Sequence, residues 1–245
     1  MISFLMLTWN RKKYLELLLP DFFKNRSSIE DYEFIIADNG SNDGSVELLL
    51  EYKNKYPKIR LFLNKKNKGL NEYKKIIKES KGEYLIIVDD DVISFPKDFD
   101  QKLVKAIDEA TNYGFIALDV VQDSHSDGAK PESHFYTEEK YPEFIIEKGP
   151  TGGWCTIFRR QDLKKVWLRF RFKSLNMRTS EDGCLSTLFN KKLGLFSGIL
   201  KNEKCLHASG PYYSKKFDAL DRDIEKYRLS RMQDFVNVYS KYKKE

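Results

Sequence analysis

Two periodicities of apolar residues alternate along the first half of the chain. Short apolar runs predict buried strands at Ile2–Leu7, Phe34–Ala37, Ile59–Leu63, Leu85–Val88 and Phe115–Val121. Between these runs, apolar residues recur about every three or four positions, which predicts helices. The alternation of strand and helix predicts an α/β fold in which a doubly wound, mostly parallel central sheet is flanked by helices.

The second half of the chain is less regular. The stretch 122–142 is polar and rich in turn residues, so we interpret it as a lid or a mobile segment. Apolar patterns predict strands at Trp154–Phe158, Leu195–Leu200 and Lys204–His207, and a helix from near Asp182 to Lys192. The tail from Ala219 to Lys243 is predicted to be one helix, with an apolar side formed by Ile224, Met232, Phe235, Tyr239 and Tyr242.

No Gly/Ser-rich or Pro-rich linker and no internal repeat interrupts the sequence. We therefore expect a single compact domain over 1–245. Within it the pattern distinguishes a regular half (1–121), a less regular half (122–218) and a C-terminal amphipathic helix (219–245).

Composition narrows the class of protein. With 41% apolar and 33% charged residues, the 245-residue chain is typical of a soluble globular protein. No apolar run approaches the roughly 20 residues of a membrane-spanning helix, and the first residues lack the basic start of a signal peptide. The three cysteines are scattered along the chain, which favours free thiols in a reducing cytosol. We expect a cytoplasmic protein.

The charge pattern suggests which partners the chain binds. The net charge of +6 favours anionic small molecules or an anionic membrane surface. No nucleic-acid-binding motif is present, so we expect no nucleic-acid partner. The C-terminal helix carries Lys241, Lys243 and Lys244 beside its aromatic residues. That helix either packs on the core or makes a peripheral contact with a membrane surface.

Three consecutive acids, Asp89, Asp90 and Asp91, follow the fourth predicted strand. Ligands of parallel sheets bind beyond the carboxyl ends of the strands, which is where these acids lie. Side chains alternate along an extended chain, so Asp89 and Asp91 are expected to point the same way and to converge on one ion. Mg²⁺ or Mn²⁺ held by carboxylates and substrate phosphates suits this arrangement. The alternative is an acidic turn, or a helix cap before Phe95-Pro96.

Two other polar segments belong to the same predicted edge. Asp38 ends the second strand, where a carboxylate can accept a hydrogen bond from a nucleotide base or ribose; alternatively it is a turn residue. After the first strand comes Thr8-Trp9-Asn10-Arg11, which is not a glycine-rich phosphate loop. Taken alone, this segment is a polar turn between strand and helix.

Together these residues resemble the nucleotide-binding half of the family-2 glycosyltransferases that have the GT-A fold. The matching segments are Thr8-Trp9-Asn10-Arg11, Asp38 to Ser45, Asn67-Lys68-Gly69, Lys81-Gly82-Glu83-Tyr84 and Asp89-Asp90-Asp91, the last containing the family's D-x-D element. In the second half, Gly149–Trp154 is similar to a glycine-rich segment that faces donor sugar and acceptor. Glu181-Asp182 is similar to the family's Glu-Asp pair.

The resemblance implies a role for each of these positions. Nucleotide and donor binding would involve Thr8, Asn10, Arg11, Asp38, Asn39, Gly69, Asp89 and Asp90. Mn²⁺ or Mg²⁺ would be held by Asp91, Asp89 and His207, and the acceptor or sugar would contact Gly152, Gly153, Trp154 and Glu181. Asp182 would be the catalytic base that deprotonates the acceptor hydroxyl.

Several of these assignments have alternatives. Asp90 could replace Asp89 in the D-x-D element. His207 could be structural, and Trp154 could be a core anchor instead of a platform for a sugar. Glu181 and Asp182 could serve only to cap a helix.

The resemblance implies an inverting, metal-dependent enzyme of the kind used in cell-surface glycan biosynthesis. It would transfer one sugar from a nucleotide-diphosphate donor, with a UDP-sugar as first candidate, to a hydroxyl of a glycan, a lipid-linked glycan or a protein. The processive members have a Gln-x-x-Arg-Trp motif, which is absent here, so a single addition is favoured. One alternative is an inactive accessory protein that binds nucleotide or glycan. Another is a sugar nucleotidyltransferase, although the glycine-rich, Arg-containing loop of that class is missing.

Overall fold

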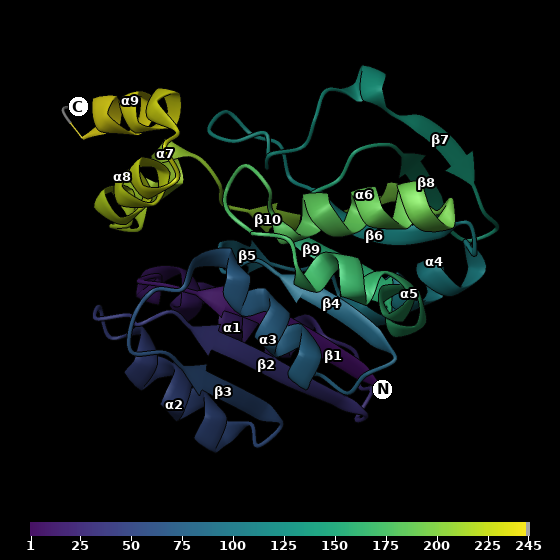
Figure 1. Ribbon diagram of the computed structural model, residues 1–245, viewed down its shortest axis with the longest axis horizontal. Helices are drawn as coiled ribbons and strands as arrows, with labels where there is room; N and C mark the ends of the chain where they lie inside the picture. The colour runs from purple at the N-terminus through teal and green to yellow at the C-terminus, as the bar shows by residue number, and fades with distance from the viewer. Residues whose placement is uncertain (244–245) are drawn as a thin grey trace.

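The computed structural model describes residues 1–243 as one sheet with helices on both faces (Figure 1). The strands are β1 (Ile2–Thr8), β2 (Tyr32–Asp38), β3 (Ile59–Leu63), β4 (Tyr84–Val88), β5 (Val92–Ser94), β6 (Tyr113–Val120), β7 (Thr137–Lys140), β8 (Ile145–Lys148), β9 (Cys155–Arg159) and β10 (Phe196–His207). The helices are α1 (Lys12–Asn25), α2 (Ser45–Lys55), α3 (Tyr73–Glu79), α4 (Phe99–Glu109), α5 (Arg160–Arg171), α6 (Glu181–Leu193), α7 (Pro211–Lys216), α8 (Leu220–Leu229) and α9 (Gln233–Tyr242), with 3-10 turns η1 (Gly69–Glu72) and η2 (Ser133–Phe135).

The strand order is β3-β2-β1-β4-β9-β6-β10-β8-β7, with β5 paired to β10. Strands β3, β2, β1 and β4 are parallel, as the sequence predicts, and this confirms the α/β class. Beyond β4 the sheet is mixed, because β9 runs antiparallel to both β4 and β6. The chain leaves β6 at the same edge at which β9 begins, so β9 has to run back across the sheet.

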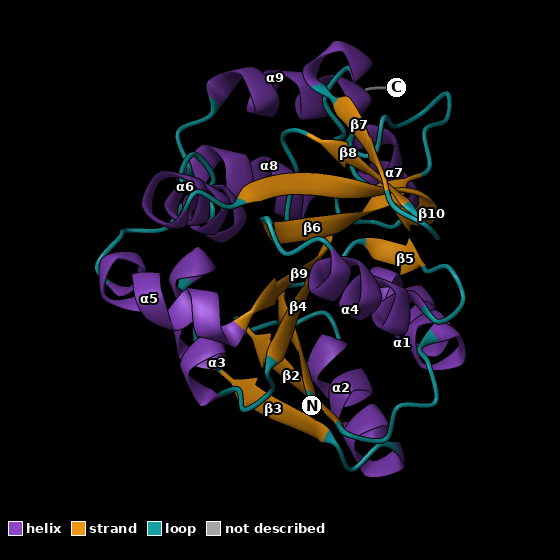
Figure 2. Ribbon diagram, turned by 90° about the vertical axis from the view of Figure 1, so that its right-hand side faces the viewer, coloured by secondary structure: helices purple, strands orange, loops and turns teal. Residues whose placement is uncertain are grey.

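Alternating side chains of each strand build the two faces of the core. Phe4 and Met6 of β1 pack in the cluster that includes α1 and α4. The neighbouring Leu5 packs in a second cluster with residues of α3, α5 and α6. Figure 2 shows these two sets of helices on opposite sides of the sheet. Cys155, Cys184 and Cys205 are free and buried, as expected.

The tail contains two helices where the sequence predicts one. The left-handed backbone of Arg231 (φ 55°) ends the first helix and turns the chain. Because of this turn, Val236 and Tyr239 of α9 pack against Ile224 and Tyr227 of α8. Phe235, predicted to face inward, is 45% exposed. The predicted segment also includes Lys244, which lies outside the described residues.

Other boundaries also differ from the prediction. The strands predicted at 195–200 and 204–207 form the single strand β10, whose pairing with β6 shifts register between Leu200 and Lys204. Such a bulge lets one strand cross a polar interruption. Helix α5 was not predicted, and the polar stretch 122–142 contains β7. In residues 1–243, none of the helices combines the length and apolar character needed to cross a bilayer.

Phe22 lies at the centre of the aromatic part of the core. It is fully buried and contacts the rings of Phe4, Phe34 and Phe99 at centroid distances of 4.9, 4.6 and 5.6 Å. We expect Phe22→Ala to lower the free energy of unfolding by about 3–5 kcal/mol, because it leaves a cavity. Phe172 is 75% exposed, so Phe172→Ala should change it by less than about 0.5 kcal/mol. Urea denaturation measures both, and equal losses would contradict this placement of the core.

Candidate active site

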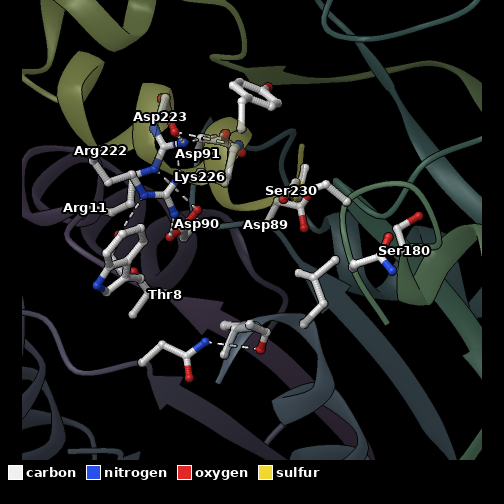
Figure 3. Close-up of a pocket in the computed structure, with 18 of the residues that line it drawn as sticks. Thr8, Arg11, Asp89, Asp90, Asp91, Ser180, Arg222, Asp223, Lys226 and Ser230 are labelled. Atoms are coloured by element: carbon white, nitrogen blue, oxygen red, sulfur yellow. Dashed lines mark hydrogen bonds and ion pairs between the residues drawn. The ribbon is translucent and has the colours of Figure 1, made fainter. Parts of the chain in front are cut away.

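The carboxyl ends of β1 and β4 open into a cavity of about 620 Å³. Its walls come from segments far apart in the sequence: the ends of both strands, the turn η1, the start of α6, and α8 with the turn that follows it. In Figure 3, Ser180 at the start of α6 lies across the cavity from Asp90, Asp223 and Arg222. The volume is in the range of pockets that hold small molecules and cofactors.

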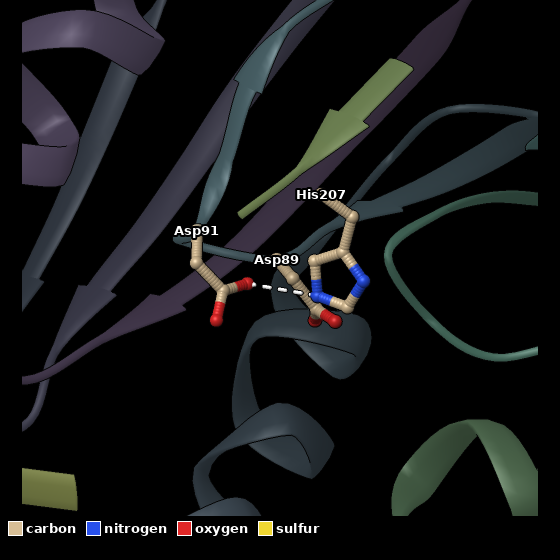
Figure 4. Close-up of side chains that lie close together, drawn as sticks. All are labelled: Asp89, Asp91 and His207. Carbon is tan, nitrogen blue, oxygen red and sulfur yellow. Dashed lines mark hydrogen bonds and ion pairs between the residues drawn. The ribbon is translucent and has the colours of Figure 1, made fainter. Parts of the chain in front are cut away.

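Asp89, Asp91 and His207 converge on one point at the edge of this cavity. One ligand atom from each lies within 4.8 Å of the others. The Nε2 atom of His207 is 3.1 Å from Asp91 Oδ1 (Figure 4). The other ring nitrogen of His207, Nδ1, lies 2.7 Å from the carbonyl oxygen of Gly128. Because a carbonyl oxygen only accepts, Nδ1 carries the proton and Nε2 is directed at the carboxylates.

Burial and mutual charge shift the pKa values of this cluster. Burial, together with the negative charge of Asp91, raises the pKa of Asp89 to about 7. Burial acts to lower the pKa of His207, but the charge and hydrogen bond of Asp91 raise it to about 9. Conversely, burial acts to raise the pKa of Asp91, but His207 and Arg11 hold it below its usual range. Asp89 and His207 therefore bind protons more tightly than usual, and a cation placed in the cluster would compete with these protons.

Asp90 belongs to a different group of side chains. It is 8% exposed and lies 3.8 Å from Arg11 Nε and 3.9 Å from Arg222 Nη2. Asp90 therefore neutralises two guanidinium groups, whereas Asp89 and Asp91 converge with His207. The acids lie in the tight turn between β4 and β5, which is closed by a hydrogen bond from Val92 N–H to the Asp89 carbonyl at 3.1 Å, so the turn and not an extended strand separates Asp90 from its neighbours.

Arg11 is buried at the centre of this second group. Its side chain is 3% exposed, and Nη2 lies 3.0 Å from Asp223 Oδ1 and 3.5 Å from Asp91 Oδ2. Its guanidinium also lies over the ring of Tyr14, 4.3 Å from the centroid. Arg11 was expected to contact a nucleotide. It lines the cavity, but its contacts are with the acids.

Asp223 of α8 connects the C-terminal helices to the acidic run. It is 1% exposed and accepts hydrogen bonds from Arg11, Arg222 and Ser214. Burial acts to raise the pKa of Asp223, but Arg11, Lys226 and Arg222 hold it far below its usual range. The sequence analysis missed this residue. The sequence feature that could have revealed Asp223 is an acid on the apolar side of a predicted helix. Its spacing places it on one helical face with Leu220, Ile224 and Tyr227.

Asp182 faces the glycine-rich segment that precedes β9. A Cβ added to Gly153 would lie 3.2 Å from the Cβ of Asp182, so the absence of a side chain lets the two segments approach. Gly152 and Gly153 line a smaller cavity that shares Asp89, Asp182 and His207 with the larger one. The predicted acceptor segment and the predicted base therefore lie side by side.

Glu181 and Trp154 are more buried than Asp182. Glu181 is 4% exposed, and burial together with the charges of Asp182 and Asp89 raises its pKa well above its usual value. Burial therefore favours the neutral form of the Glu181 carboxyl. Trp154 is 2% exposed and donates its indole N–H to the carbonyl of Leu118 at 2.8 Å. This burial favours the core-anchor interpretation of Trp154 over an open platform for a sugar.

The residues predicted to hold a nucleotide divide into two groups. Thr8, Asn39 and Gly69 line the larger cavity, and the Asn39 amide donates to the Gly69 carbonyl at 3.2 Å. Asn10 and Asp38 do not line it. Each is held by the turn after β2: Asn10 Oδ1 accepts from the backbone of Asn42, and Asp38 Oδ1 from those of Gly40 and Ser41. A contact of either with a nucleotide stays a prediction.

Comparison with known proteins identifies the family. The model of glycosyl transferase family 2 matches residues 3–167. The chain belongs to this family. The match contains the acidic run, whereas Asp182, His207 and Asp223 lie beyond it, so their places are known from the structure alone.

Curated relatives match part of the chain. It is 35% identical over 91 residues to the cholesterol galactosyltransferase of Borreliella burgdorferi, covering 37% of this chain and 25% of that protein. It is also 35% identical over 109 residues to the dolichyl-phosphate beta-glucosyltransferase of Dictyostelium discoideum, covering 41% and 33%. The chain thus spans a quarter to a third of the length of these two relatives.

Solved structures of glycosyltransferases share the fold. The mannosyltransferase PcManGT from Pyrobaculum calidifontis, in complex with GDP-Man and Mn²⁺, has a TM-score of 0.65 at 15% identity, covering 93% of this chain and 63% of that chain. TarS 1-349 of S. aureus, in complex with UDP-GlcNAc, has a TM-score of 0.65 at 16% identity, covering 98% and 71%. The fold is therefore the GT-A fold expected from the sequence.

Removing Asp223 tests the contact between α8 and the acidic run. We expect Asp223→Ala to lower the free energy of unfolding by about 3–5 kcal/mol, because it leaves the buried Arg11 without its nearest acid. Asp221, two residues earlier, is exposed and pairs with Lys243 at the surface. Asp221→Ala should cost less than about 1 kcal/mol. Guanidinium denaturation compares the two variants, and an equally small loss in both would show that Arg11 does not depend on Asp223.

Proposed function

We propose that this chain is an inverting glycosyltransferase that moves one sugar from a nucleotide-diphosphate donor to an acceptor hydroxyl. The observation that carries the proposal is the convergence of Asp89, Asp91 and His207 beside Asp182, at the junction of the two cavities. The cluster of Asp89, Asp91 and His207 suits a diphosphate with its cation. Asp182 suits an acceptor hydroxyl that has to lose a proton.

The chemistry of the ligand atoms favours Mn²⁺ in the acidic cluster. Carboxylate oxygens suit both Mg²⁺ and Mn²⁺, whereas an imidazole nitrogen is a poorer ligand for Mg²⁺. The Gly128 carbonyl orients the His207 ring in the way that outer partners orient metal-binding histidines. A bound cation would offset the charge that develops on the departing diphosphate.

Asp182 is the residue that we propose as the catalytic base. It lies between the metal cluster and Gly152-Gly153, so an acceptor in the smaller cavity would present its hydroxyl to this carboxylate. Glu181 is less suited to the role, because it is 4% exposed and burial raises its pKa, which favours the protonated form over the carboxylate that a base requires. Glu181 would instead support the start of α6.

The larger cavity is the proposed donor site. Thr8, Asn39 and Gly69 line the part beyond the ends of β1 and β2, where nucleotides bind in open α/β sheets. The matched structures support a nucleotide-sugar donor, because they were solved with GDP-Man and with UDP-GlcNAc. A UDP-sugar is our first candidate. The acceptor would be a hydroxyl of a glycan, a lipid-linked glycan or a protein, and the enzyme would act at the cytoplasmic side.

Substitution of Asp182 tests the role of the base. We expect Asp182→Asn to lower donor turnover by about 10²- to 10⁴-fold, because the amide cannot accept the acceptor's proton. Release of nucleoside diphosphate from a panel of UDP- and GDP-sugars with Mn²⁺ measures turnover, and calorimetric titration with UDP and GDP measures binding. Nucleotide affinity should stay within about threefold of the wild type, because Asp182 would contact only the acceptor side.

Glu181→Gln is the matched comparison, because it is the same carboxyl-to-amide change at the neighbouring residue. It should lower turnover by less than about tenfold. Normal turnover in Asp182→Asn would refute the base assignment. Nucleotide binding by the wild type without any turnover would identify an accessory binding protein instead of an enzyme.

A further inference from the structure

Large apolar side chains are unusually exposed on two segments of the chain that each contribute residues to the larger cavity. In residues 1–243, the three most exposed large hydrophobic side chains are Phe172 (75%), Leu229 (69%) and Leu168 (64%). Leu168 lies on α5, Phe172 directly follows this helix, and Leu229 ends α8. Isolated apolar side chains are common on protein surfaces, but several on two segments that share a cavity suggest an interaction site.

The same two segments carry a concentrated positive charge. Residues 163–180 contain six basic residues and no acid: Lys164, Lys165, Arg169, Arg171, Lys173 and Arg178. Residues 226–233 contain Lys226, Arg228 and Arg231, again without an acid. The whole chain has a net charge of +6, so these segments hold more than that excess. Among the described residues, only Lys165 and Lys226 of this set form ion pairs, with Asp162 and Asp223.

The two segments meet at the mouth of the cavity. Leu175 and Met177 of the first, and Leu229 and Ser230 of the second, line the same cavity. Arg178 donates a hydrogen bond to the backbone carbonyl of Arg231 at 2.9 Å. We call residues 164–178 and 226–231 the basic rim. Its apolar and basic side chains are intermixed, as in the placement of the Arg171 guanidinium 4.8 Å from the centroid of the Phe172 ring.

We propose that the basic rim docks this protein on the surface of an anionic lipid bilayer. Exposed Leu and Phe side chains would enter the boundary between headgroups and acyl chains, and the surrounding Lys and Arg side chains would pair with anionic headgroups. A soluble polyanion would use the charges but gives no reason for exposing Leu168 and Phe172. We therefore favour a bilayer as the partner of this surface, because a bilayer accounts for both the positive charge and the exposed apolar side chains.

The rim differs from the membrane contact expected from the sequence. That expectation placed the contact at Lys241, Lys243 and Lys244, at the end of the tail. In the structure, Phe235 and Val238 of α9 are 45% and 46% exposed, whereas the three most exposed apolar side chains lie on α5, directly after it, and at the end of α8. If the proposed function holds, docking here would present the cavity mouth to an acceptor anchored in the same bilayer. The docking itself does not depend on that function.

Vesicle flotation with the full chain tests the proposal. Vesicles of 60% phosphatidylcholine and 40% phosphatidylglycerol should carry the wild type upward, and vesicles of phosphatidylcholine alone should bind at least about tenfold less. Arg169→Glu with Arg171→Glu should weaken binding to the anionic vesicles at least about tenfold, because two attractive charges become repulsive. Leu168→Ser with Phe172→Ser should also weaken it about tenfold, because both side chains lose their place in the bilayer.

Helix α2 offers matched controls on the opposite side of the sheet (Figure 2). Lys53 and Lys55 are exposed at the same spacing as Arg169 and Arg171, and Leu50 is 43% exposed. Lys53→Glu with Lys55→Glu, and separately Leu50→Ser, should bind anionic vesicles like the wild type. Circular dichroism verifies that all variants are folded.

Three results would overturn the proposal. The first is a wild type that does not bind anionic vesicles. The second is an equal loss of binding in the α2 charge variant (Lys53→Glu with Lys55→Glu) and in the α5 charge variant (Arg169→Glu with Arg171→Glu). Wild-type binding by Leu168→Ser with Phe172→Ser, together with equal affinity for inorganic polyphosphate, would identify a general anion site. Donor turnover in solution separates the two proposals: turnover without vesicle binding refutes the docking alone, and vesicle binding without turnover refutes the proposed function alone.

Discussion

The buried guanidinium of Arg11 is the constraint on which the site depends. It joins three parts of the chain, because it lies at the start of α1 and contacts Asp90 and Asp91 after β4 and Asp223 on α8. A buried charge without partners costs several kcal/mol, so these acids are required wherever Arg11 is buried. The positive charge of Arg11 in turn reduces the repulsion between the neighbouring carboxylates, which are largely shielded from water. The position of α8 and the division of the acidic run follow from the same contacts.

This division gives each acid a separate task. Asp90 and Asp223 pair with Arg11 and Arg222, while Asp89 and Asp91 converge with His207. Asp91 also lies 3.5 Å from Arg11, so it borders both groups. The C-terminal helices thereby become a wall of the larger cavity. Figure 1 shows these helices at one end of the molecule. Substitutions in α8 should therefore alter the position and charge balance of the acidic run, although more than a hundred positions separate the two segments in the sequence.

Local pattern was sufficient to predict the parallel strands from β1 to β4 and the edge where the acids gather, because periodicity and strand direction are local properties. It also predicted that Asp89 and Asp91 share one side, which the geometry agrees with. Local pattern could not predict that Asn10 bonds to the turn after β2, or that Arg11 is buried by an acid of α8, because both depend on contacts between distant segments. The break at Arg231 was missed because an apolar side that continues through a turn has the same period as one long helix. The burial of Trp154 was left open for a similar reason, since glycine neighbours suit both a loop and a packed anchor.

We propose that Arg11 and Arg222 together hold Asp90 away from a metal ion, whereas Asp91, which also lies 3.5 Å from Arg11, faces His207 and binds the metal with it. Anomalous diffraction from crystals soaked with Mn²⁺ and UDP tests it most directly. The account predicts one Mn²⁺ peak within coordination distance of Asp91 and His207, with Asp90 still paired to Arg11. A peak bound by Asp90, with Arg11 displaced from the acids, would contradict it.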